Sequence, residues 1–100
     1  MPLNHPSTRD PDGRVVVFDA GTLLHLALSR PELMGETELI LGTVAHPDHR
    51  ADDPIAGREH FYRRDLDPQR WLRVVVDYGD VPAWVVTAIV QENPPRDWKS

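Results

Sequence analysis

The chain has 100 residues, a formal net charge of −5 at pH 7 and no cysteine. This length allows one domain, and a chain of this size buries only about 60–70% of the surface that it exposes when unfolded. The absence of cysteine excludes disulfides, thiolate zinc sites and a cysteine nucleophile. No run approaches the roughly 18 apolar residues of a membrane span, and no signal-peptide pattern is visible, so we expect a soluble cytoplasmic domain.

The acidic balance argues against a general polyanion-binding protein. Ten of the eleven Lys and Arg side chains are nevertheless Arg, the residue suited to bidentate contacts with phosphate or carboxylate groups. Codon usage in a GC-rich genome would produce the same excess of Arg.

The first half of the chain predicts a strand followed by two helices. Residues 1–13, rich in Pro and small polar residues, are expected to form a disordered lead-in. Residues 14–18 contain three β-branched Val residues and predict a strand, and Thr22 is the expected N-cap of a helix over residues 23–29. Its apolar stripe is expected to contain Leu24 and Leu28, broadened by Leu23, Leu26 and Ala27. A second helix begins at Pro31 or at Thr37 and continues to residue 45.

The second half predicts a polar loop over residues 46–57 and then strands at 58–64, 71–78 and 83–91. The short links between these strands favour an antiparallel meander. The expected fold is therefore α+β in the order β-α-α-β-β-β, an antiparallel sheet with two N-terminal helices on one face, forming a single domain over residues 14–98. We expect Trp98 to fold back onto this domain.

Alternation along the strand at 58–64 separates two sets of side chains. With Phe61 in the core, the opposite set is Arg58, His60, Tyr62 and Arg64. Arg73 and Thr87 of the next two strands can join this face. Such a set suits an RNA phosphate, because Arg offsets charge in the transition state and His transfers protons at neutral pH. The alternative is a solvated face whose Arg side chains pair with carboxylates such as Glu59 and Asp77.

Three other patterns carry weaker signals. His25 in the leucine-rich helix is more typical of a boundary residue than of a catalyst. The cluster of His46, Asp48 and His49, with Asp52 and Asp53 nearby, superficially resembles a metal site but lacks further ligands at a fixed spacing. Residues 18–23 are similar to the nucleophile loop of haloacid-dehalogenase-like phosphatases or the first acidic strand of PIN-domain nucleases. Both families need further acidic motifs on a longer parallel α/β chain, so we reject this interpretation.

Over residues 14–98 the order of elements resembles small bacterial and phage proteins of the barnase–EndoU–colicin–RelE-like (BECR) nuclease folds. The resemblance rests on four pieces in sequence. These are His25 followed by Arg-Pro-Glu-Leu at 30–33, the helix that ends in His-Pro-Asp at 46–48, Phe-Tyr-Arg-Arg at 61–64 with Trp-Leu-Arg-Val-Val-Val at 71–76, and Val-Val-Thr-Ala at 85–88 with a Pro-containing tail and Trp98.

The resemblance implies a metal-independent ribonuclease without a cofactor, often a toxin controlled by an antitoxin protein. It implies His25 as general acid/base, Tyr62 and Arg64 as phosphate ligands and Thr87 as a hydrogen-bond donor to the phosphate. Arg30 stands where the family often has a second His. If that His is catalytic, either the activity of this protein is weakened or Arg30 serves as the electrophile instead.

The acidic net charge differs from the basic ribosome-dependent members and favours a discrete RNA substrate, such as a tRNA. In this hypothesis His25 or His60 moves protons, with Arg58, Arg73 and Arg30 around the phosphate. The competing hypothesis is an inactive member whose Arg/Tyr face binds a protein or RNA.

Overall fold

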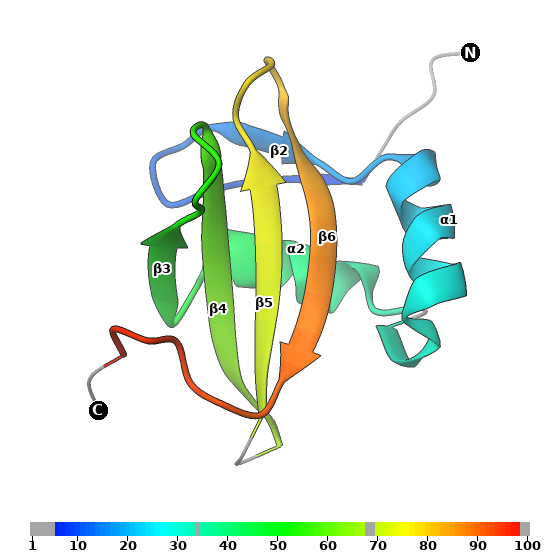
Figure 1. Cartoon of the computed structure of the whole chain (residues 1–100). Helices are drawn as coiled ribbons and strands as arrows, with labels where there is room; N and C mark the ends of the chain where they lie inside the picture. Colours follow the sequence, from blue (N-terminus) through cyan, green and yellow to red (C-terminus); the bar gives the residue numbers. More distant parts are fainter. Residues whose placement is uncertain (1–5, 34, 68–69, 99–100) are drawn as a thin grey trace.

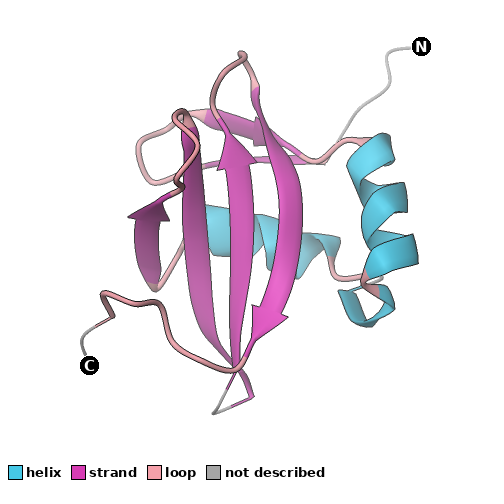
Figure 2. Cartoon of the chain, viewed as in Figure 1, coloured by secondary structure: helices cyan, strands magenta, loops and turns pink. Residues whose placement is uncertain are grey.

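The computed structural model describes residues 6–33, 35–67 and 70–98 of the chain. Its elements, in chain order, are β1 (Ser7–Arg9), β2 (Val15–Val17), α1 (Ala20–Ser29), the 3-10 turn η1 (Pro31–Leu33), α2 (Thr37–Ala45), β3 (His49–Asp52), β4 (Arg58–Asp67), β5 (Arg70–Asp77) and β6 (Ala83–Gln91) (Figure 1). The strands form one six-stranded sheet in the order β1-β2-β6-β5-β4-β3. Helices and strands are segregated in the way that defines the α+β class (Figure 2).

The expected meander is confirmed, because β4 pairs antiparallel with β5 and β5 pairs antiparallel with β6. The sheet is not purely antiparallel, however, because β2 pairs with β6 in the parallel direction, with Val16 opposite Ala83. Parallel neighbours need a long crossover between them. Here the whole segment from α1 to β5 provides it, a long-range pairing that no local pattern signals.

Two strands were not expected. The sequence predicts a disordered lead-in over residues 1–13, of which residues 1–5 lie outside the described part and residues 6–13 are ordered. Instead β1 pairs with β2 across a turn in which Asp10 Oδ1 accepts the backbone N–H groups of Asp12 and Arg14, and Gly13 has a φ of 85°. Pro-Asp-Gly at 11–13 is a turn sequence with a clear mechanism. The polar loop at 46–57 likewise contains β3, which pairs with β4 at the sheet edge.

The first helix starts earlier than expected. Asp19, rather than Thr22, is its N-cap, since the Asp19 carboxylate accepts the backbone N–H of Thr22 at 2.7 Å. The predicted apolar stripe is right only in part, because Leu23 and Leu26 face the core but Leu24 and Leu28 do not. Leu24 and Leu28 are 63% and 78% exposed, whereas Leu26 is buried. The second helix begins at Thr37, the later of the two expected starts, and Pro31 opens the separate turn η1.

The core lies on one face of the sheet, against both helices. Phe61 is fully buried, as expected, and packs in one cluster with strand residues such as Leu72 and Val74 and helix residues such as Leu26 and Ile40. Burying each such side chain contributes about 1.5–3 kcal/mol. Figure 1 shows α2 behind the meander and α1 beyond β6.

The other sheet face carries the polar set. Register places Tyr62 directly opposite Arg73, and Val75 lies between His60 and Thr87, so these side chains share one face as predicted. From the end of β6, the C-terminal residues run past the ends of β5 and β4 toward β3 (Figure 1). Trp98 packs against Trp71 with ring centroids 4.9 Å apart, which confirms its expected return to the domain. In the described part of the chain, no helix has the length and apolar character needed to cross a bilayer.

Candidate functional site

A hollow of about 410 Å³ lies on the polar sheet face, between strands β3–β6 and the C-terminal residues. We call it the sheet hollow. Its lining residues are Ala51, Asp52, Pro54, His60, Tyr62, Arg73, Gln91, Pro94, Pro95, Arg96 and Asp97. The strands supply its floor, and the C-terminal residues supply one wall. It therefore has the size of a small-ligand pocket, for which about 300–1,000 Å³ is usual.

His60 is held at both ring nitrogens inside this hollow. Its Nε2 lies 2.5 Å from Oδ2 of Asp53, and its Nδ1 lies 3.2 Å from the hydroxyl of Tyr62. A carboxylate only accepts hydrogen bonds, so Nε2 carries the proton and Nδ1 of a neutral ring accepts from Tyr62. The imidazole and the Asp53 side chain are only 13% and 14% exposed. The result is an Asp53–His60–Tyr62 chain that ends at a phenolic hydroxyl.

Asp53 is itself fixed by the turn after β3. The backbone N–H of Ile55 donates to Oδ1 of Asp53 at 2.8 Å. This hydrogen bond, followed by the one with His60, holds the pKa of Asp53 below its usual value. The carboxylate is therefore charged at neutral pH, and it would stabilise an imidazolium at His60 if that ring took up a second proton.

Arg73 brings positive charge to the floor of the hollow. It lies on β5 directly opposite Tyr62, and its Nε, like that of Arg30 on the distant helix, is buried without a hydrogen-bond partner among the described residues. A buried donor without a partner costs about 1–3 kcal/mol. An anion bound in the hollow would remove that cost, so Arg73 is the best candidate anion ligand.

The other predicted residues of this face lie outside the hollow. Arg58 donates from Nε to Oδ2 of Asp77 at 3.1 Å, which is the pairing that the solvated-face alternative expected. Arg64 has its guanidinium carbon 5.5 Å from the centre of the Trp98 ring. Thr87 lies opposite Val75 on β6 and is not among the lining residues.

His25 and Arg30 are not brought to the hollow. His25 is exposed on α1, and Arg30 is the C-cap residue of that helix. The helix lies beyond β6 (Figure 1), and none of its described residues lines the hollow. The helix imidazole and the sheet arginines therefore do not converge on one phosphate-sized space, because α1 packs through Leu26 and turns His25 toward solvent.

Two residues of the metal-like cluster have other partners. Asp48 accepts the backbone N–H of Arg64, and His49 Nε2 lies 2.8 Å from Oδ1 of Asp97. The described residues contain no group of three or more side chains placed to hold a metal ion.

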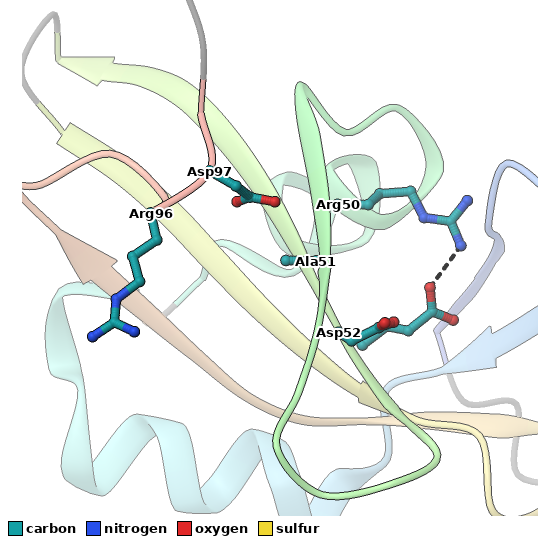
Figure 3. Close-up of a pocket in the computed structure, with 6 residues that line it drawn as sticks. Arg50, Ala51, Asp52, Arg96 and Asp97 are labelled. Carbon is teal, nitrogen blue, oxygen red and sulfur yellow. Dashed lines mark hydrogen bonds and ion pairs between the residues drawn. The ribbon is translucent and has the colours of Figure 1, made fainter.

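Sequence reasoning missed Asp53, Gln91 and Arg96. Asp53 looked like one more acid in a polar loop, because its contact with His60 depends on a strand that the sequence did not signal. Arg96 follows two prolines that suggested only the end of the fold. A second depression, beside β3, shares Ala51, Asp52, Arg96 and Asp97 with the sheet hollow, and Figure 3 shows its lining, including the ion pair between Arg50 and Glu59.

No family model, curated protein or solved structure matches this chain.

Proposed function

We propose that the protein is a metal-independent RNA endonuclease whose reaction takes place in the sheet hollow. One observation carries the proposal. His60 is held between the Asp53 carboxylate and the Tyr62 hydroxyl, beside an arginine whose buried Nε lacks a partner. Proton transfer and binding of an anion are therefore available in the same space.

RNA supplies its own nucleophile, so the protein must move protons and stabilise charge. The 2′-hydroxyl attacks the adjacent phosphorus and gives its proton to the oxygen of Tyr62, while Tyr62 passes its own proton to Nδ1 of His60. Asp53 stabilises the imidazolium that forms. The same chain then returns the proton to the departing 5′-oxygen. The products are a 2′,3′-cyclic phosphate and a 5′-hydroxyl end.

Arg73 acts on the phosphate. Its guanidinium offsets the negative charge that grows on the nonbridging oxygens as the 2′-oxygen attacks. Because Nε is already desolvated, its hydrogen bond to an anion is stronger than one made in open water. Arg73 thus takes the electrophile role that the resemblance implied for Arg30, and the His60–Tyr62 pair takes the acid/base role that it implied for His25.

The test is cleavage of single-stranded RNA in the presence of EDTA. The wild-type protein should cut, and the new ends should be cyclic phosphates. Tyr62→Phe and His60→Ala should each lower the rate by about 10²-fold or more. Arg63→Ala is the matched control, since Arg63 is exposed and lies on the opposite face of β4. RNA that stays intact at high protein concentration would overturn the proposal.

The proposal also includes the fold family, the RNA substrate, the cellular location and the toxin role that the resemblance implies. Two helices before a meander, with His, Tyr and Arg on its open face, support a BECR-like domain that acts on RNA, such as a tRNA, in the cytoplasm. If the protein is a toxin, its expression in a bacterial host should arrest growth. The arrest should be relieved by His60→Ala and by co-expression of an antitoxin protein.

A non-catalytic binding module is the second candidate. The net charge of −5 and the pairing of Arg58 with Asp77 favour it, because both reduce the attraction for a polyanion. This candidate predicts a stoichiometric complex with a protein that weakens with salt and is unchanged by Tyr62→Phe.

A further inference from the structure

The C-terminal segment makes the sheet hollow concave. Residues 94–97 line the hollow opposite the strands, and Pro95 is buried. These residues belong to no strand. Side-chain contacts therefore hold the wall in place, and the hollow keeps its volume of about 410 Å³ with the segment present. The segment borders the space rather than filling it.

Three contacts anchor this wall. Trp98 packs edge-on against Trp71 at 4.9 Å, and the imidazole of His49 contacts both the Asp97 carboxylate, at 2.8 Å, and the Trp98 ring, at 5.8 Å. Figure 3 shows the Asp97 carboxylate turned toward β3. Its charge is therefore engaged by β3 rather than directed at a ligand in the hollow.

Arg96 immediately precedes these anchors and is exposed. Figure 3 shows its side chain pointing away from Asp97 and Arg50. No described residue forms a hydrogen bond or ion pair with Arg96, whereas Arg14, Arg50 and Arg58 are each paired with carboxylates. A cation without a partner thus lies on the wall of a hollow whose floor contains the buried Nε of Arg73.

We propose that Arg96 is a substrate-binding residue that contacts a phosphate of single-stranded RNA in the sheet hollow, and that the C-terminal segment is a fixed wall of the binding site. This inference rests on the proposed function and adds a second phosphate contact to that of Arg73. Because the two guanidinium groups lie on different sides of the hollow, they favour a single-stranded RNA that runs through it, with Arg73 and Arg96 binding consecutive phosphates.

The experiment measures binding of a 2′-O-methyl oligoribonucleotide, which lacks the nucleophilic hydroxyl and cannot be cut, by fluorescence anisotropy at several salt concentrations. Arg96→Ala should weaken binding by about 3–10-fold at low salt. It should also reduce the slope of log affinity against log salt by about 0.7, the value for one phosphate contact on a single strand. Arg63→Ala should leave both quantities near those of the wild type.

A second variant separates a wall from a lid. Trp98→Ala releases the anchor and should weaken binding as Arg96→Ala does, and the double variant should lose little more, because both act through one segment. Tighter binding by Trp98→Ala would identify the segment as a lid and overturn the inference. If the wild type binds and Arg96→Ala binds equally well, this inference fails and the proposed function stands. If the wild type does not bind, both fail.

Discussion

The hydroxyl of Tyr78 donates a hydrogen bond to Oδ2 of Asp10 across 2.7 Å, joining the turn of the first hairpin to the end of β5. Asp10 is only 4% exposed, and its carboxylate also accepts from Nε of Arg14 at 2.7 Å. Arg14 in turn lies over the Tyr78 ring, 3.7 Å from its centre. Burial, followed by the hydrogen bond to Asp10, raises the pKa of Tyr78, which keeps the hydroxyl a donor.

Tyr78→Phe should therefore destabilise the fold by about 1.5–3 kcal/mol, the usual contribution of a hydrogen bond to a charged group. Urea unfolding followed by far-ultraviolet circular dichroism measures the change. Val81→Ala serves as a control, since Val81 is 99% exposed and its truncation should change stability by less than about 0.5 kcal/mol. Equal stability of Tyr78→Phe and the wild type would show that the first hairpin is not held by this contact.

Asp53 should give the fold an acid-sensitive contribution. The N–H of Ile55, and then His60, hold its pKa below the ordinary 3.8, so the unfolded chain takes up a proton at a higher pH than the folded one. The stability that Asp53 provides is complete at neutral pH and is lost as the pH falls below about 4. Unfolding free energies measured from pH 7 to pH 3 should thus fall more steeply for the wild type than for Asp53→Asn. Parallel curves would contradict this.

Two glycine substitutions should have opposite signs. Gly13 has a φ of 85°, and an added Cβ would meet nothing within 4 Å, so Gly13→Ala should cost about 1 kcal/mol through backbone strain alone. Gly42 lies inside α2, where the nearest contact of a Cβ would be Arg63 Nη1 at 3.9 Å. Gly42→Ala should stabilise by about 0.5–1 kcal/mol. Thermal unfolding of both variants tests the two predictions. A Gly13→Ala variant more stable than the wild type would argue against the positive φ of Gly13 in the turn between β1 and β2.

The orientation of α1 can be tested with two leucines. Leu26 is 3% exposed, and Leu26→Ala should cost about 2–4 kcal/mol by leaving a cavity. Leu24 is 63% exposed, so Leu24→Gln should change stability by less than about 0.5 kcal/mol. Chemical denaturation of both variants measures the difference. A larger loss of stability for Leu24→Gln than for Leu26→Ala would show that Leu24, rather than Leu26, faces the core.

The sequence predicted the parts of the fold that depend on local patterns. Alternation about Phe61 separated core from open face, and short turns specified the meander, which together placed Tyr62 and Arg73 on one face. The Pro-Asp-Gly turn at residues 11–13 also carried a readable signal for the first hairpin. It was outweighed by the polar composition around it.

The candidate site was predictable only in part. His60, Tyr62 and Arg73 were identified because they alternate along two paired strands. Asp53 contacts His60 from the turn after β3, which the sequence did not signal as a strand. Arg96 lines the hollow from a non-strand segment, whose position depends on contacts such as Trp98 with Trp71. The leucines of α1 are spaced so that more than one face of the helix could be buried. In the structure Leu26 is buried and Leu24 is exposed, and this orientation turns His25 away from the hollow.

The parallel pairing of Val16 with Ala83 has a consequence for biosynthesis. During translation the first hairpin emerges early, but its inner edge has no neighbour until β6 leaves the ribosome. Closure of the sheet is then a late step that joins two strands far apart in the sequence. Contacts so far apart in sequence slow folding, so nascent chains that lack β6 should be open to proteases over most of their length.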